Sequence, residues 1–210
     1  MWQRIAALSM LSCLAALGAT AQEPGAGANP ARKTAGLWLD VPFLRQSEEG
    51  CGAASIAMVM RYWEGHGGAP AGATADPEQI QKKLFSPKAH GIFASAMEKY
   101  LRESGFDVFA LAGQWDDLRE HLAKGRPLIV GLKPRQNKTA LHYVVVAGLD
   151  GGLNGGEDEK TPAVLINDPA RGKLLRVERA EFEAEWSAVH NWMLLALPHA
   201  AAKTPAGSAR

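Results

Sequence analysis

Cysteine is scarce in this sequence. Only Cys13 and Cys51 occur among its 210 residues, and neither they nor the six histidines have the spacing of a metal site. A disulfide framework is therefore not expected. We also predict that the protein uses no metal ion and no other cofactor.

The sequence also lacks a charge imbalance. Its 23 basic and 22 acidic residues leave a formal net charge of +1, and the basic residues form no cluster. Domains that bind nucleic acid usually carry a basic patch. Many nucleotide-binding domains carry a glycine-rich loop that ends in Lys and Ser or Thr. Because both features are missing, neither nucleic acid nor nucleotide is expected as a partner.

Long apolar runs are missing too. The most apolar stretch, Ile5–Leu17, is shorter than the roughly 20 residues that span a bilayer, so the mature chain should have no membrane span. Arg4 before this stretch and the small residues Ala19–Ala21 after it are typical of an export signal. We therefore predict a signal peptide over 1–21 and a periplasmic or extracellular protein. Lipoprotein anchoring at Cys13 is a less favoured variant, because the apolar stretch continues beyond it.

The remaining residues suffice for one folded domain. The segments 22–35 and 199–210 are rich in small residues and proline, so they are predicted to be a flexible lead-in and a disordered tail. Residues 36–198 should form a single domain with a proper core. Removal of the signal would leave Cys51 as the only cysteine. The oligomeric state is not indicated.

Hydrophobic patterning places helices mainly in the first half and strands mainly in the second, which is typical of an α+β fold. The pattern around Cys51 is apolar nearly all round, so that helix should be buried. The predicted helices are 51–63, 77–84, 92–103, 116–123 and 180–186, and the predicted strands are 37–41, 108–111, 128–132, 143–149, 163–167, 174–177 and 192–197.

Cys51 lies where the turn residue Gly50 meets the start of the buried helix. The N-terminus of a helix stabilises a thiolate, which is the nucleophilic form of cysteine. Attack on a carbonyl also requires hydrogen-bond donors for the oxyanion that forms. The backbone N–H of Cys51 and the side-chain amide of Gln46 can both supply such a donor.

Polar residues border two apolar strands in the second half of the chain. His142 opens one strand, and a histidine facing a cysteine on a helix is the arrangement found in papain. Asn167 and Asp168 end the next strand, and either can accept from the far ring nitrogen of His142 and orient the ring. The predicted catalytic set is therefore Cys51, His142, Asp168 and Gln46, with Asn167 as an alternative to Asp168.

These motifs resemble the bacteriocin-processing peptidase family, whose members are papain-like domains that precede peptide-exporting ABC transporters and cut leader peptides after a double glycine. The similarity extends from Trp38 to Leu197. It rests on Gln46, Cys51-Gly52-Ala53-Ala54, His142-Tyr143 and Asn167-Asp168-Pro169.

The resemblance implies a papain-like fold, in which a helical N-terminal half packs on an antiparallel sheet from the C-terminal half and the nucleophile begins a central helix. It implies Cys51 as nucleophile, His142 as base and Asp168 as the residue that orients His142. It also implies Gln46 in the oxyanion hole.

Two features depart from the family pattern. Gly50 stands where family members carry an acid, and no transporter segment accompanies the domain. The chain is therefore similar to a free-standing, exported member, for which double-glycine specificity is not implied. We expect an exported cysteine peptidase with a peptide or protein substrate. A papain-like cell-wall endopeptidase or amidase, and an exported peptide-binding protein without activity, are the alternatives.

Overall fold

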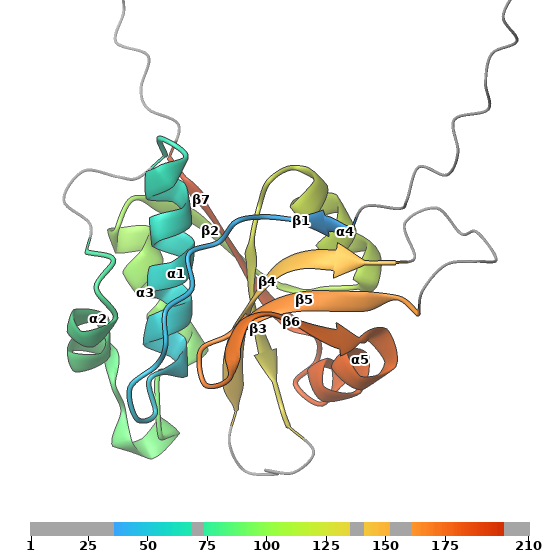
Figure 1. Ribbon diagram of the computed structural model, residues 1–210. Coiled ribbons are helices and arrows are strands. Elements are labelled where there is room, and N and C mark those ends of the chain that lie inside the picture. The colour runs from blue at the N-terminus through green and yellow to red at the C-terminus, as the bar shows by residue number, and fades with distance from the viewer. Residues whose placement is uncertain (1–35, 69–73, 135–140, 152–160, 200–210) are drawn as a thin grey trace, which may run out of the picture. The chain divides into compact units, whose positions relative to one another are not determined.

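The structure is a computed structural model that describes residues 36–68, 74–134, 141–151 and 161–199. One antiparallel sheet lies at the centre of these residues (Figure 1). The predicted signal peptide, the lead-in and residues 200–210 of the predicted tail lie outside the described residues. The strands are β1 Leu37–Trp38, β2 Phe106–Ala112, β3 Leu128–Leu132, β4 His142–Asp150, β5 Ala163–Asp168, β6 Gly172–Glu178 and β7 Trp192–Pro198. Their order is β2-β7-β3-β4-β5-β6, and β1 pairs with the far end of β4.

Helices cover both faces of this sheet. They are α1 Cys51–Gly65, α2 Pro77–Leu84, α3 Ala94–Glu103, α4 Trp115–Ala123 and α5 Arg179–Ser187, with the short 3-10 helix η1 at Pro87–Ala89. Figure 1 shows α1, α2 and α3 on one side of the sheet and α4 and α5 on the other. Each predicted helix and strand is present. Helices α4 and α5 form a second helical layer.

Local signals explain where several elements begin and end. Helix α2 starts as predicted, because the Asp76 carboxylate accepts hydrogen bonds of 2.9 Å from the N–H groups of Glu78 and Gln79. The predicted strand 37–41 is wrong beyond Trp38. There the N–H of Val41 donates to the carbonyl of Leu39 at 2.8 Å, which turns the chain out of the sheet.

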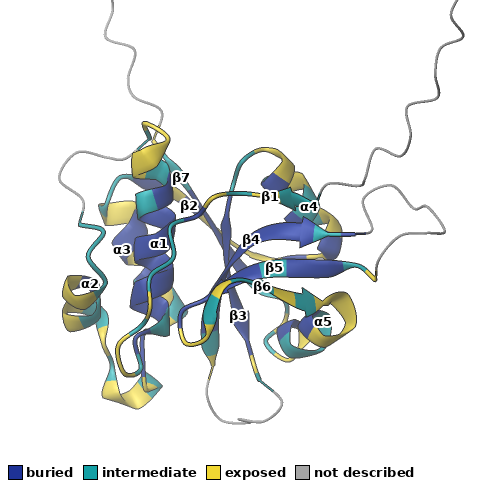
Figure 2. Cartoon of the chain, viewed as in Figure 1, coloured by how far each residue is buried: buried dark blue, intermediate teal, exposed yellow. Residues whose placement is uncertain are grey.

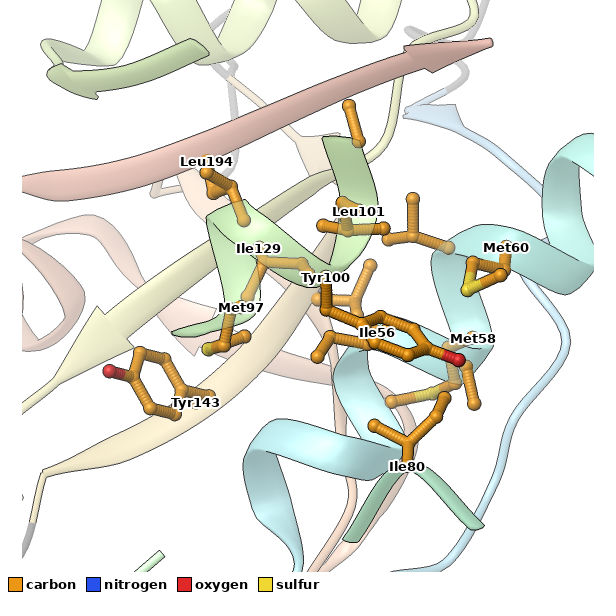
Figure 3. Packing of buried hydrophobic residues seen from close by; sticks show 14 of the residues in the cluster. Ile56, Met58, Met60, Ile80, Met97, Tyr100, Leu101, Ile129, Tyr143 and Leu194 are labelled. Atoms are coloured by element: carbon orange, nitrogen blue, oxygen red, sulfur yellow. The ribbon is translucent and has the colours of Figure 1, made fainter. Parts of the chain in front are cut away.

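The face under α1 forms one half of the core. Helix α1 buries ten residues on nearly all of its sides, which confirms the prediction of a buried helix (Figure 2). Figure 3 shows Ile56 of α1 packed with Ile80 of α2, Leu101 of α3, Ile129 of β3 and Leu194 of β7. Burial of side chains from three helices and two strands in one cluster fixes α1 against the sheet.

The opposite face forms the other half of the core. Leu118 of α4 and the aromatic pair Phe182 and Trp186 of α5 pack there against Val144 and Val146 of β4. Residues 144 and 146 face this layer, whereas residues 145 and 147 face α1, as strand alternation requires. Strand β4 is therefore buried on both faces.

A β-bulge near Gly148 brings β1 close to β4. The pairing with β5 shifts between Val146 and Gly148, and after this shift Leu149 faces the α4 and α5 layer. A Cβ atom at Gly148 would lie 2.6 Å from the carbonyl oxygen of Leu37 and 2.8 Å from Cβ of Trp38. Only glycine lets the two backbones approach this closely.

We expect Gly148→Ala to destabilise the fold by about 1–3 kcal/mol, because the new methyl group meets backbone atoms that cannot move independently. Gly65→Ala is the matched control: a Cβ there meets nothing within 4 Å at the end of α1, and alanine favours a helix. Urea unfolding followed by circular dichroism measures both. Equal stability of the two variants would contradict this account of the bulge.

Candidate active site

Cys51 is the first residue of α1, as the sequence predicts, and no side chain caps the start of this helix. Gly50 is the N-cap and provides no side-chain cap, and the first turn contains no acidic residue. A tight turn precedes it, in which the N–H of Gly50 donates to the carbonyl of Ser47 at 3.1 Å. A Cβ at Gly50 would lie 2.8 Å from Oγ of Ser47. The first N–H groups of α1 are thus available to an anion at Cys51.

Ser55 connects the nucleophile helix to the strand that carries His142. It lies four residues after Cys51, on the same face of α1, and is fully buried. Its hydroxyl donates to the carbonyl of Tyr143, next to His142, at 3.3 Å. This hydrogen bond holds the start of α1 against the start of β4. Ser55 was not predicted from the sequence as part of the site, although its position four residues after Cys51 places it on the same helix face.

His142 and Asp168 form a buried pair. Nε2–H of His142 donates to Oδ1 of Asp168 at 2.8 Å, and the two side chains are 18% and 5% exposed. The register pairs Val145 of β4 with Asn167 of β5, so Asp168 lies one residue nearer to His142 on the same sheet face. The N–H of Ala170 also donates to Asp168 Oδ1, at 2.9 Å.

Asn167, the alternative to Asp168, points to the other face of β5 and does not contact His142. Its amide donates to the carbonyl of Val41 at 3.0 Å, and its Oδ1 accepts from the N–H of Leu174 at 2.9 Å. Leu174 has a φ of 48°, which is unusual for a residue other than glycine. The Asn167 side chain therefore joins the segment at Val41 to strand β6, and the contact with His142 belongs to Asp168.

Burial lowers the pKa of His142, but hydrogen bonds with Asp168 and Cys51 outweigh this effect and raise that pKa from 6.5 to about 9. Burial raises the pKa of Asp168, but the hydrogen bond and positive charge of His142, the N–H of Ala170 and the charge of Arg171 together outweigh it, so the net pKa lies below its ordinary value. Because Nε2 binds Asp168, Nδ1 is the ring nitrogen left for the sulfur of Cys51. The imidazolium thus lies between two groups that carry or accept negative charge.

Gln46 lies beside the other three residues. Its backbone N–H donates to the carbonyl of Pro169 at 3.0 Å, which ties the segment before α1 to the turn after Asp168. Its side chain lines the same groove as Cys51, and its buried Oε1 has no hydrogen-bond partner among the described residues. The structure therefore brings together all four residues predicted from the sequence.

A groove of about 960 Å³ opens over this site. Its lining includes Cys51 and His142 and continues across the sheet to Ile166 of β5 and Phe182 of α5. Apolar and polar side chains contribute about equally to this lining. Cys51, which is partly exposed, opens into this groove.

Two other features were sought among the described residues, namely a membrane-spanning helix and a metal site. None of the helices there is both long and apolar enough to cross a membrane. The same residues contain no group of three or more His, Cys, Asp or Glu placed to hold a metal ion. The chemistry that these residues can perform is nucleophilic attack by a thiolate with a histidine as proton carrier.

Comparison with known proteins identifies similar sequences. The profile described as Peptidase_C39 like family matches residues 38–193. The chain is 30% identical over 145 residues to the lactococcin-G-processing and transport ATP-binding protein LagD of Lactococcus lactis subsp. lactis. This match covers 69% of the chain but only 17% of LagD.

Solved structures share the fold. A double glycine motif protease from an AMS/PCAT transporter, in complex with the leader peptide, superposes with a TM-score of 0.56 at 23% identity, covering 77% of this chain and 94% of that one. A putative C39-like peptidase from Bacillus anthracis superposes with a TM-score of 0.58 at 15% identity, covering 80% of this chain and all of that one. The mixed helix and antiparallel-sheet fold is thus that of the papain-like C39 peptidases, as predicted.

We expect Asp168→Asn to lower the pKa of His142 from about 9 toward 6.5, because the substitution removes the carboxylate that stabilises the imidazolium. The titration of the His142 ring protons, followed by NMR, measures this pKa directly. Asp150→Asn is the matched control, since Asp150 pairs with Arg176 at the far end of β4. An unchanged His142 titration in Asp168→Asn would contradict the assignment of Asp168 as a group that raises the pKa of His142.

Proposed function

The chain belongs to the Peptidase_C39-like family, and we propose that it hydrolyses peptide bonds with Cys51 as nucleophile and His142 as its proton carrier. Family and fold are those of cysteine peptidases. The observation that carries the proposal is the contact of His142 with both Asp168 and Cys51 at the open start of α1. A purely structural histidine would not need a thiol on one side and a buried carboxylate on the other.

The acylation step follows from these contacts. The sulfur of Cys51 attacks the carbonyl carbon of the substrate, and the carbonyl oxygen becomes an oxyanion. The N–H of Cys51 and the amide of Gln46 donate to this oxyanion. His142 then gives its proton to the departing amine as the C–N bond breaks, which leaves a thioester on Cys51.

Deacylation reverses the role of His142. The neutral ring accepts a proton from water, and the hydroxide attacks the thioester carbonyl. The C–S bond breaks, the carboxylic acid product leaves, and the proton returns to the Cys51–His142 pair. Asp168 keeps Nε2 protonated throughout, so Nδ1 stays directed at the sulfur. Because the protonated ring is needed for acylation, activity should fall as the pH rises through about 9.

Variants of the three groups should give different signatures. Cys51→Ala should abolish both iodoacetamide labelling and cleavage of a peptide library, whereas His142→Ala should slow both. Gln46→Ala should lower kcat by roughly 100-fold while labelling continues, because only the oxyanion is affected. Gln79→Ala on the exposed side of α2 is the control. Labelling and cleavage rates are measured on the same preparations, the latter by mass spectrometry.

Three outcomes would contradict the proposal. Full turnover by Cys51→Ala would exclude the cysteine mechanism. Slow labelling that is indifferent to His142→Ala would favour a peptide-binding protein that keeps the fold. Release of peptidoglycan fragments without cleavage of any peptide in the library would favour a cell-wall endopeptidase or amidase.

We further propose that the protein acts after export, because Arg4, the apolar stretch Ile5–Leu17 and the small residues Ala19–Ala21 form the pattern of a signal peptide. The exported protein should then begin at Gln22, and Ala21→Asp should block this cleavage. Intact mass spectrometry of each cell fraction measures the N-terminus. A mature form that begins at an acylated Cys13 would favour a lipoprotein, and an uncleaved chain would contradict the signal.

A further inference from the structure

A carboxylate and an imidazole form one end of the groove beside Cys51. Glu49 precedes Cys51 by two residues, and His90 follows η1; both line the groove. Nδ1 of His90 lies 3.1 Å from Oε1 of Glu49, and the two side chains are 80% and 38% exposed, respectively. The mechanism described above uses neither residue.

The backbone at both positions is unusual. Glu49 has a φ of 53° and His90 a φ of 47°, which are left-handed values that residues other than glycine seldom adopt. Such conformations persist where surrounding contacts impose them, and they are frequent at functional sites. Here the side chain of Gln81 donates to the Glu49 carbonyl at 3.3 Å, and the backbones of Ser86 and Gly91 form a bridge next to His90. The backbone position from which the Glu49 side chain enters the groove is therefore fixed by the fold.

The local geometry also explains why the charge lies at this position. Gly50 has no room for a side chain, because a Cβ would lie 2.8 Å from Oγ of Ser47. Glu48 is exposed and does not line the groove, although it carries the same charge one residue earlier. Glu49 is thus the last position before Cys51 that can present a carboxylate to a bound substrate.

His90 orients this carboxylate without having to cancel its charge. A neutral imidazole that donates from Nδ1 occupies one lone pair of Oε1 and leaves the negative charge in place. Both Asp168 and His142 take part in the catalytic contacts, so Asp168 is not a free acceptor for substrate. Glu181 and Glu185 also line the groove, but both belong to α5, whereas Glu49 is the carboxylate two residues before the nucleophile.

We propose that Glu49 is a specificity-determining residue that binds a Lys or Arg side chain of the substrate close to the scissile bond. This inference names the substrate class of the proposed peptidase and rests on that function: the substrate would be a basic peptide segment. The alternative, in which the Glu49–His90 contact only fixes the loop before Cys51, predicts no dependence on the charge of the bound group.

The first test measures charge preference without requiring peptide cleavage. Aminoethyl, methyl and sulfonatoethyl methanethiosulfonate modify a thiolate by the same reaction but carry a positive, no and a negative charge. We expect Glu49→Gln to reduce the ratio of the cationic to the anionic rate at Cys51 by about three- to tenfold. Glu48→Gln, which removes an equal charge outside the groove, should leave the ratio within about twofold of the wild-type value.

His90→Asn separates selection from a structural role, because asparagine tolerates the left-handed backbone and leaves Glu49 in place. We expect this variant to keep a rate ratio closer to the wild-type value than to that of Glu49→Gln, because the charge of Glu49 remains although His90 no longer orients it. Equal changes of all three rates in Glu49→Gln, with an unchanged ratio, would overturn the inference and support a purely structural contact. The same drop in ratio for Glu48→Gln would overturn it as well, since the effect would then be a general one of net charge.

Cleavage of defined peptides is the second test. In a peptide that the wild type cuts, Lys→Gln at the position that binds Glu49 should lower kcat/KM by about three- to tenfold, and Glu49→Gln should remove this difference. Cleavage without any preference for basic residues would overturn the inference and leave the peptidase function intact. Absence of cleavage of every peptide would count against the peptidase function, whereas the reagent ratios would still test the charge at Glu49.

Discussion

The site depends on the packing of α1 against β4. Cys51 and His142 lie 91 positions apart in the sequence, and only this contact between a helix and a strand brings them together. The helix is buried on nearly all sides, so its direction is set by the core and not by its own propensity. The hydrogen bond from Ser55 to the Tyr143 carbonyl then fixes the position of the helix along its own axis relative to β4. A shift of one helical turn would separate the sulfur from the imidazole by about 5 Å.

Strand alternation decides which of two adjacent polar residues contacts His142. Asn167 and Asp168 are adjacent on β5, so their side chains point to opposite faces of the sheet. Asp168 lies on the face of His142, whereas Asn167 lies on the face of Val41 and holds the chain that leads toward Gln46. Two neighbouring polar residues thus serve different purposes: one contacts the imidazole, and the other places the segment that carries the proposed oxyanion donor.

The sequence predicted the elements and the four central residues because each had a local signal. Cys51 begins an apolar helix, and His142 borders a strand of β-branched residues. What it could not predict depends on register and on contacts between distant segments. Choosing Asp168 over Asn167 required knowing how β5 pairs with β4. The Glu49–His90 contact joins two loops whose left-handed backbones follow from tertiary contacts and have no signature in residue type.

Electrostatics couples this site to the stability of the fold. The pKa of His142 is about 9 in the folded chain, above the ordinary 6.5 that applies when the chain is unfolded, so the folded state binds the proton more tightly. Protonated His142 therefore stabilises the fold. This contribution is fully present below about pH 6.5 and is lost as the pH rises through about 9. The contacts that would keep an acid ready for the leaving amine in the proposed mechanism thus also stabilise the folded chain at neutral pH. For this residue, the proposed acylation step and the stability of the fold both favour the protonated imidazole, whereas the proposed deacylation step uses the neutral ring.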